Sequence, residues 1–252
     1  MRELERNPPS DIPPCSSLAI IGRGRLGQAL SSALRRTGMS IDGPLGRGAD
    51  GAGAPAVLLC VPDSEIAAAA ASLMPGPLVG HCSGATGLDV LAGHEAFALH
   101  PLMTVTAAGA SFRGAGAAVA GSSPRALALA HELAARLELQ PVEVADADRP
   151  LYHAAASMAS NFLITLEAAA EQLAAPAGVT RAMLGPLVRA SVENWLEQGP
   201  ERALTGPIAR GDEATVDRQR AAIADRAPEL LELFDGLAIA TRRLARTEAQ
   251  PA

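Results

Sequence analysis

The sequence contains no lysine, because all 21 basic residues of this 252-residue chain are arginine. No lysine is therefore available as an acid, a base or a Schiff-base former. Aromatic residues make up only 2% of the chain, so the core must be built from alanine, leucine, valine and isoleucine. The three cysteines are odd in number and form no CxxC pair, which favours a reducing, cytoplasmic setting.

A basic surplus and a long apolar run are also missing. The net charge of −6 argues against a general nucleic-acid-binding protein, which needs a basic face. The most apolar window, residues 66–74, is too short to span a bilayer, so we expect no membrane association. Residues 1–16 are polar, charged and proline-rich, lack the apolar stretch of a signal peptide, and predict a flexible arm.

The most informative segment that is present is a glycine-rich turn after a short apolar run. Residues 18–21 read Leu-Ala-Ile-Ile, and Gly22, Gly24 and Gly27 then lead into a helical pattern. This strand–turn–helix order is typical of a dinucleotide-binding site. Gly22 permits the tight turn, Gly24 lets the backbone approach a pyrophosphate, and Gly27 lets the helix pack closely on the strand. The predicted cofactor-binding residues of this turn are Gly22, Arg23, Gly24, Arg25, Leu26 and Gly27.

The kind of dinucleotide depends on the residue about 20 positions after the turn. Counting from Gly27 leads to Arg47, whose guanidinium can pair with the 2′-phosphate of NADP. Counting from the first glycine leads instead to Asp42, an acid suited to the ribose of NAD. We expect NADP rather than NAD, and a solvated loop arginine is the alternative for Arg47. Val61 and Pro62 follow a later apolar run and are expected to line the cofactor site.

Strand-like and helix-like segments alternate through the first half of the chain. This alternation predicts an α/β fold with a doubly wound parallel sheet of the Rossmann kind. The expected strands cover residues 18–21, 39–41, 56–61, 78–81, 96–99, 116–120 and 142–144. Beyond residue 146 only helical spacing is found. We therefore expect a flexible N-terminal arm at 1–16, a dinucleotide-binding domain at 17–146 and an all-α substrate and dimerisation domain at 147–252.

Polar side chains follow two of the later expected strands. Ser83 comes shortly after the strand at 78–81, and His100 comes directly after the strand at 96–99. The carboxyl ends of parallel strands meet at one edge of a sheet, so both side chains should face the ligand crevice there. Ser83 is a candidate for binding the nicotinamide amide or a substrate carboxylate, and His100 for donating to a substrate oxygen. Packing within a turn is the alternative for the histidine, and its spacing with His81 fits no zinc module, so we expect no metal.

Several stretches of the chain resemble one bacterial family. They are residues 79–85 (VGHCSGA), 99–104 (LHPLMT), 152–156 (YHAAA), 160–162 (SNF) and 204–212 (LTGPIARGD), and the last is the longest and most specific. The chain is similar to proteins that join a Rossmann-like domain to a C-terminal domain of unknown function 2520. That family lies within the superfamily of 6-phosphogluconate dehydrogenase, ketopantoate reductase and pyrroline-5-carboxylate reductase. The resemblance implies an NADP-type oxidoreductase fold, a dimer, and a reduction of the ketopantoate kind.

His153 and Asn161 lie on the first expected helix of the second domain. With Ser157 between them they step by four residues along an otherwise apolar helix, so they are either exposed or gathered around a polar ligand. The resemblance implies that this helix brings a proton donor and a partner asparagine to the substrate. His153 is the candidate donor, because lysine is absent and an imidazole titrates near neutrality. His100 and Tyr152 are the alternative donors.

Arg210 lies in a segment with too many glycines and prolines for a helix, and it is a candidate clamp for a substrate carboxylate. The expected function is an NADP-dependent oxidoreductase that reduces a small carbonyl acid. An imine reductase of the pyrroline-5-carboxylate type and a non-catalytic NADP-binding protein are the alternatives. We also expect a homodimer, because the last helix carries a broad apolar face made of Leu230, Leu231, Leu233, Phe234 and Leu237.

Overall fold

A computed structural model describes residues 15–51, 53–106 and 109–247 of the chain. The chain forms two compact units, Met1–Ser160 and Asn161–Ala252. The expected domain boundary between residues 146 and 147 precedes a helix that belongs to the first unit. The expected arm at residues 1–16 lies outside the described residues except for its last two positions.

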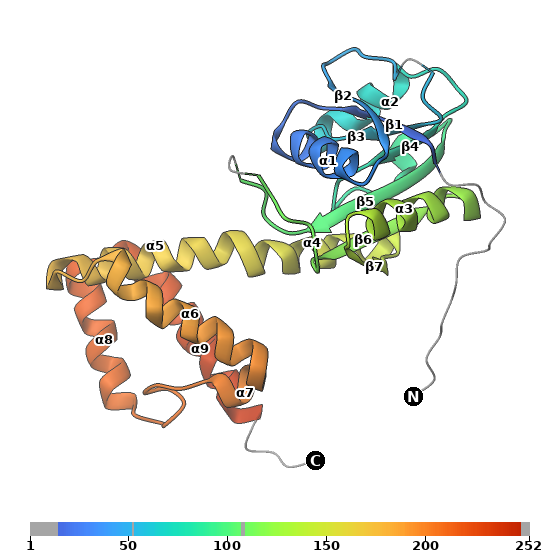
Figure 1. The fold of residues 1–252 in the computed structure, drawn as a ribbon. Helices are drawn as coiled ribbons and strands as arrows, with labels where there is room; N and C mark the ends of the chain where they lie inside the picture. The colour runs from blue at the N-terminus through green and yellow to red at the C-terminus, as the bar shows by residue number, and fades with distance from the viewer. Residues whose placement is uncertain (1–14, 52, 107–108, 248–252) are drawn as a thin grey trace. The chain divides into compact units, whose positions relative to one another are not determined.

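The first unit is built on a seven-stranded sheet with the order β2-β1-β3-β4-β5-β6-β7 (Figure 1). Its strands are β1 (Ser17–Ile21), β2 (Ser40–Leu45), β3 (Ala56–Leu59), β4 (Leu78–His81), β5 (Glu95–Leu102), β6 (Gly116–Gly121) and β7 (Gln140–Glu143). Every expected strand is present, with bounds that differ by a few residues. The pairs β1–β2, β1–β3, β3–β4 and β4–β5 are all parallel, so the carboxyl ends of these five strands meet at one edge.

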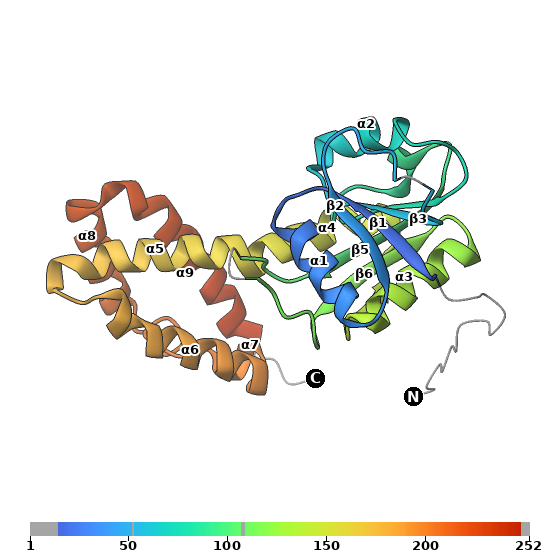
Figure 2. The ribbon, with the colours of Figure 1, turned by 45° about the horizontal axis from the view of Figure 1, so that its top comes forward.

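Helices cover both faces of this sheet. They are α1 (Arg25–Arg36), α2 (Ile66–Ala71), α3 (Pro124–Arg136), α4 (Arg149–Ser157) and the short 3-10 helices η1 (Asp63–Glu65), η2 (Leu88–Leu91) and η3 (Asp146–Asp148). Alternate residues of a strand point to opposite faces. In β1, Leu18 and Ile20 join the core under α1 and α3, whereas Ala19 and Ile21 join the core under α2 and η2. Figure 2 shows α1 and α2 on opposite faces of the sheet.

The sheet reverses direction between β5 and β6. These two strands are antiparallel, and β6 and β7 are parallel to each other. The expectation of a parallel sheet is therefore confirmed for β1 to β5 and wrong for the step to β6. A parallel step needs a crossover, usually a helix. The described residues of the connection 103–115 form no helix, so the chain returns as an antiparallel neighbour, while α3 provides the crossover from β6 to β7.

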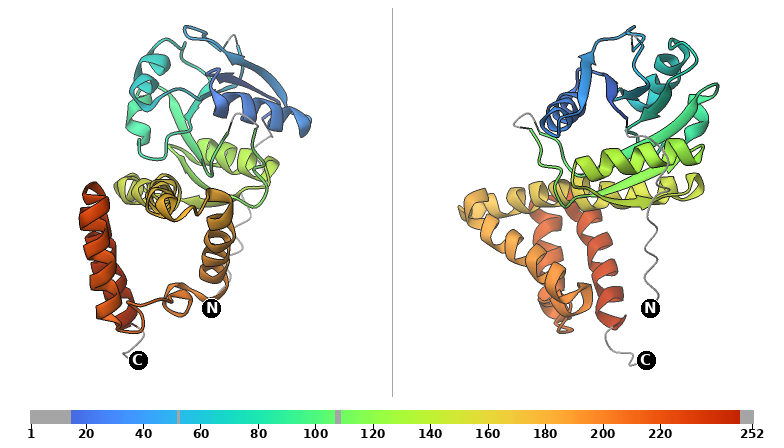
Figure 3. Two further views of the ribbon diagram at one scale, coloured as in Figure 1. Left: turned by 90° about the vertical axis from the view of Figure 1, so that its left-hand side faces the viewer. Right: turned by 45° about the vertical axis from the view of Figure 1, so that its right-hand side comes forward.

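The regular elements among the described residues of the second unit are all helices, as expected. Its elements are α5 (Leu163–Ala174), η5 (Ala175–Ala177), α6 (Arg181–Gln198), α7 (Pro200–Ala203), α8 (Glu213–Arg226), η6 (Pro228–Leu230) and α9 (Leu231–Thr247). Figure 3 shows these helices spread apart rather than packed as a closed bundle. A π-helix, Met158–Phe162, comes between α4 and α5, so the first expected helix of the second domain, which includes His153 and Asn161, is interrupted. None of the helices among the described residues is long and apolar enough to cross a membrane.

Candidate functional site

The turn between β1 and α1 needs its three glycines for different reasons. Gly22 has φ +126°, and a Cβ there would lie 2.1 Å from the carbonyl oxygen of Cys60. A Cβ at Gly27 would lie 1.9 Å from the carbonyl oxygen of Gly22. Gly24 has φ −67°, and nothing lies within 4 Å of its Cβ position. The first and third glycines are therefore required by the fold, whereas the second borders open space that a ligand can approach.

The N-terminus of α1 has backbone N–H groups without a side-chain cap and no acidic residue in its first turn, so it can bind an anion. Its N-cap is Gly24, which has no side chain to accept a hydrogen bond from the first N–H groups. The first turn of α1 also carries no acidic residue. The first N–H groups and the positive end of the helix dipole are therefore left for a negatively charged group such as a pyrophosphate.

A cavity of about 420 Å³ opens beside this turn. It is bordered by the turn, the loop after β2, the end of β3, and α2 with the residue that precedes it. The structure brings six predicted cofactor residues to its wall: Gly22, Arg23, Gly24, Arg47, Val61 and Pro62. Of the other three, Gly27 packs within the fold, Leu26 packs against the core, and Arg25 borders a separate cavity of about 600 Å³ beside α1.

Two arginines and one glutamate border the cavity. The Nη2 atom of Arg47 donates to the Glu65 carboxylate, with both oxygens 2.8 Å away. The side chain of Arg47 is 85% exposed, so this pair lies at the rim. The guanidinium carbon of Arg23 lies 3.4 Å from where a Cβ of Gly46 would be, so this second cation lies beside the loop that carries Arg47. The arrangement suits an anionic ligand with several oxygens.

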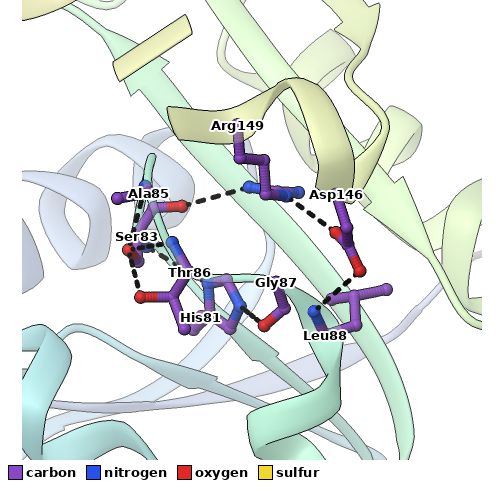
Figure 4. Close-up of polar contacts among 8 residues, drawn as sticks. All are labelled: His81, Ser83, Ala85, Thr86, Gly87, Leu88, Asp146 and Arg149. Carbon is purple, nitrogen blue, oxygen red and sulfur yellow. Dashed lines mark hydrogen bonds and ion pairs between the residues drawn. The ribbon is translucent and has the colours of Figure 1, made fainter. Parts of the chain in front are cut away.

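The turn after β4 holds His81 and Ser83 in a closed hydrogen-bond network (Figure 4). His81 is buried; its Nδ1 accepts from the backbone N–H of Ser83 at 3.2 Å, so Nε2–H donates to the carbonyl of Gly87 at 3.1 Å. Burial lowers the pKa of His81, which keeps the ring neutral. The Ser83 hydroxyl lies 2.7 Å from an Asp63 oxygen and accepts from the N–H of Thr86 at 3.0 Å. Both side chains therefore hold the turn in its present shape.

A fully buried arginine, Arg149, ties this turn to α4 (Figure 4). Its Nε donates to Asp146 Oδ1 at 3.0 Å, and its Nη1 donates to the carbonyl of Ser83 at 3.4 Å. Its Nη2 is buried and has no hydrogen-bond partner among the described residues. The Asp146 side chain is 56% exposed, so the buried charge is only partly compensated. Arg149 is not among the site residues predicted from the sequence.

His100 lies within β5 rather than directly after the strand, because the strand continues to Leu102, and it pairs with Tyr152 of α4. Its Nδ1 lies 2.8 Å from the Tyr152 hydroxyl, and the two rings meet edge to face. The His153 ring lies 6.3 Å from the His100 ring, measured between centroids. Burial first, and then the nearby His153 and Arg149, lower the pKa of His100 to about 4. The first unit therefore brings together the three groups predicted as alternative proton donors, and His100 is neutral at pH 7.

Asn161 and Arg210 lie in the second unit. The step by four holds from His153 to Ser157 within α4, but Asn161 lies in the π-helix, where the spacing of a regular α-helix does not apply. Arg210 is exposed, and its backbone N–H donates to the carbonyl of Gly206 at 3.2 Å. A convergence of these two residues with His153 stays a prediction.

In the described part of the chain, no group of three or more histidine, cysteine, aspartate or glutamate side chains is placed to hold a metal ion. His81 uses both of its ring nitrogens in the turn after β4. The neighbouring Cys82 is buried, with its Sγ 3.7 Å from that of Cys60.

A family model for the domain of unknown function DUF2520 matches residues 115–241, half of the chain. The chain belongs to the DUF2520 family. The resemblance drawn from the sequence is thereby confirmed. No curated protein sequence matches this DUF2520 protein.

Solved structures share the fold of this DUF2520 protein. Protein BF3122 from Bacteroides fragilis has a TM-score of 0.77 at 21% identity, covering 90% of this chain and 98% of its own. Protein TM1727 from Thermotoga maritima has a TM-score of 0.74 at 21% identity, covering 92% and 100%. A reductive aminase from Aspergillus terreus in complex with NADPH and ethyl-5-oxohexanoate has a TM-score of 0.66 at 17% identity, covering 90% and 94%. At these identities the likeness confirms the Rossmann-like fold with its helical C-terminal region.

Proposed function

We propose that the chain is an NADP-dependent oxidoreductase that reduces a small carbonyl acid of the ketopantoate kind. The observation that carries this proposal is the cavity beside the glycine turn. It combines open space at Gly24, an uncapped helix N-terminus and Arg47 at the rim. These three features fit the pyrophosphate and the 2′-phosphate of NADP. The fold shared with an NADPH-bound reductive aminase supports the same cofactor.

Different residues of the chain would bind different parts of the cofactor. The backbone of the turn, from Gly22 to Gly24, and the first N–H groups of α1 would bind the pyrophosphate. Arg47 would pair with the 2′-phosphate, and Val61 and Pro62 would line the ribose side from the end of β3. When bound, NADPH supplies a hydride to the substrate carbon, and positioning and proton transfer fall to the protein.

The proton that accompanies the hydride is assigned to His153. His100, with a pKa lowered to about 4, is a weak proton carrier at neutral pH and serves better as the hydrogen-bond partner of Tyr152. His153 is exposed on α4 near that pair. Asn161 stays the candidate for orienting the substrate, and Arg210 the candidate for binding its carboxylate. Ser83 would contact a ligand only after giving up bonds that it now makes within its turn.

The test is NADPH oxidation with a panel of 2-oxo acids that includes ketopantoate. His153→Gln should reduce turnover by about 10²–10⁴-fold while NADPH binding stays unchanged. The matched control is His131→Gln, because His131 lies on α3 and pairs with Glu143 at 3.5 Å. Arg210→Ala should mainly raise KM. Near-normal turnover of the His153 variant would transfer the donor role to His100 or Tyr152.

Two alternatives have distinct outcomes in the same assay. An imine reductase would oxidise NADPH with a cyclic imine and not with the oxo acids, and the fold shared with the reductive aminase favours including that substrate. A non-catalytic NADP-binding protein would bind NADPH and turn over nothing in the panel. In that case, replacing His153 would have no consequence for any measured rate.

We further infer a homodimer in a reducing, cytoplasmic setting. The three cysteines are free thiols, which supports such a setting. Large apolar side chains of the second unit are exposed, and they include Phe162, Ile164, Leu187, Trp195, Leu196, Leu233 and Leu237. An exposed apolar surface of this kind is typical of an interface. A second copy of the chain is the partner that the DUF2520 resemblance implies.

A further inference from the structure

We propose that Glu65 competes with the 2′-phosphate of NADP for Arg47, and that Glu65 thereby limits how strongly the site prefers NADP over NAD. This inference rests on the proposed function. It adds a residue that the spacing rule for dinucleotide sites does not reach, because Glu65 follows β3 rather than β2.

The geometry places the two side chains on different walls of one cavity. Arg47 belongs to the loop after β2, and Glu65 is the last residue of η1, directly before α2. Both border the cavity of about 420 Å³ beside the glycine turn. The Arg47 Nη2 atom lies 2.8 Å from each oxygen of the Glu65 carboxylate. An anion that takes this nitrogen from inside the cavity must therefore displace or share the carboxylate.

The other side chains of the cavity wall favour the adenosine end of a dinucleotide. Glu65 is the one acidic side chain among the described residues that border the cavity, and Arg23 adds a second cation. Ala68 and Ala69 contribute small apolar side chains from α2, against which a base can lie. The glycine turn also borders this cavity, and a pyrophosphate would be held there. With a pyrophosphate at the turn, the loop after β2 that carries Arg47 is where the 2′-phosphate of the adenosine is expected.

NADP and NAD are expected to affect the Arg47–Glu65 ion pair differently. An ion pair as exposed as this one is worth little, so it opens readily. A phosphate monoester carries about −1.5 to −2 charges and three acceptor oxygens, and it is a stronger partner for a guanidinium than one carboxylate. NAD has a neutral hydroxyl at the same position and cannot displace Glu65. Glu65 therefore opposes NADP, through lost pairing and charge repulsion, and leaves NAD unaffected.

The experiment uses the two adenosine fragments as probes, 2′,5′-ADP and 5′-AMP, titrated calorimetrically into the full chain. Glu65→Gln should tighten 2′,5′-ADP about three- to tenfold and leave 5′-AMP unchanged. Arg47→Ala should weaken 2′,5′-ADP by roughly tenfold to a hundredfold, and the double variant should lose most of the gain from Glu65→Gln. The matched control is Glu171→Gln, because the Arg181–Glu171 pair also has a distance of 2.8 Å, and its exposed fractions of 84% and 37% match the 85% and 37% of the Arg47–Glu65 pair.

The outcomes separate this inference from the proposed function. If the unaltered chain binds neither NADPH nor 2′,5′-ADP, the proposed function fails and the inference fails with it. If the unaltered chain binds 2′,5′-ADP and Glu65→Gln binds it equally well, only the inference is overturned. An equal gain for 5′-AMP would also overturn it, because Glu65 would then act on the adenosine and not on the phosphate.

Discussion

The sheet unit and the helical unit bury their apolar side chains to very different degrees. In the first unit, core clusters on both faces of the sheet contain fully buried residues such as Leu58 and Phe97. In the second unit, only four apolar residues among the described positions are buried, and two of them are alanines. They are Val216, Ile223, Ala227 and Ala238. The sheet unit therefore supplies its own hydrophobic stabilisation, and the helical unit leaves much of its apolar surface to be covered by something else.

This difference in burial follows from the geometry of strands and helices. A sheet strand buried on both faces, such as β3 with the sequence AVLL, finds helices above and below it within the same unit. A helix buries one stripe and needs a neighbour along that stripe. In α6 the large apolar residues Met183, Leu187, Trp195 and Leu196 are all exposed. The comparison indicates that the sheet unit is a self-contained scaffold, whereas the described helices of the second unit leave large apolar side chains uncovered.

The largest effect is expected in the sheet core. Leu58 is fully buried on β3, so Leu58→Ala removes packed methyl groups and leaves a cavity. We expect a loss of about 2–5 kcal/mol in the free energy of unfolding, measured by urea denaturation. A loss below ~1 kcal/mol would break the comparison, because the sheet unit would then not be stabilised by its own core.

We expect pH to have an intermediate effect on the unfolding free energy, through His100 in the sheet unit. The pKa of His100 is lowered from 6.5 to about 4 in the folded protein, mainly by burial, so the unfolded chain binds a proton there at a higher pH than the folded protein. This contribution to stability is fully present above pH 6.5 and is lost as the pH falls from 6.5 towards 4. After allowing for partial exposure, we expect about 2 kcal/mol over this range. His100→Gln should flatten the profile of unfolding free energy between pH 6.5 and pH 4.

The smallest effect on the single chain is expected in the helical unit. Leu196 on α6 is 69% exposed, so Leu196→Ala should change the unfolding free energy of the isolated chain by less than about 0.5 kcal/mol. If a second copy covers this face, the unaltered protein has twice the chain mass of 25.7 kDa in light scattering, and the variant dissociates at a higher concentration. A single-chain mass for the unaltered protein at micromolar concentration would argue against the dimer.

Sequence patterns predicted the strands and the glycine turn because those features depend on local rules. Strand β4, at Leu78–His81, has the expected bounds because it is a short apolar run that follows glycine and proline residues. The reversal of strand direction at β6 depends on the absence of a helix among the described residues of the connection 103–115. Hydrophobic periodicity within the strands does not reveal the direction of the next strand. The π-helix at Met158–Phe162 likewise leaves no distinct pattern in a helical sequence.

The candidate site was harder to predict because its key contacts are distant in sequence. The pair of His100 and Tyr152 joins residues 52 positions apart. Arg149 lies in a polar segment that reads as a linker, and its spacing from Asp146 signals an ion pair but gives no hint of full burial. Glu65 borders the cavity beside the glycine turn from beyond β3, and only the fold brings it to Arg47.

The central claim is that the cavity beside the glycine turn binds NADP, and Gly24 is the residue that tests it best. Because nothing lies within 4 Å of its Cβ position and its φ is −67°, Gly24→Asp should fold normally, unlike substitutions at Gly22 or Gly27. The measurement is calorimetric titration of NADPH into the unaltered protein, Gly24→Ala and Gly24→Asp, with unfolding curves as the folding control. We predict at least a ~100-fold loss of affinity for the aspartate variant, from charge repulsion at the pyrophosphate, and a smaller loss for the alanine variant. An unchanged NADPH affinity in a folded Gly24→Asp variant would contradict the account.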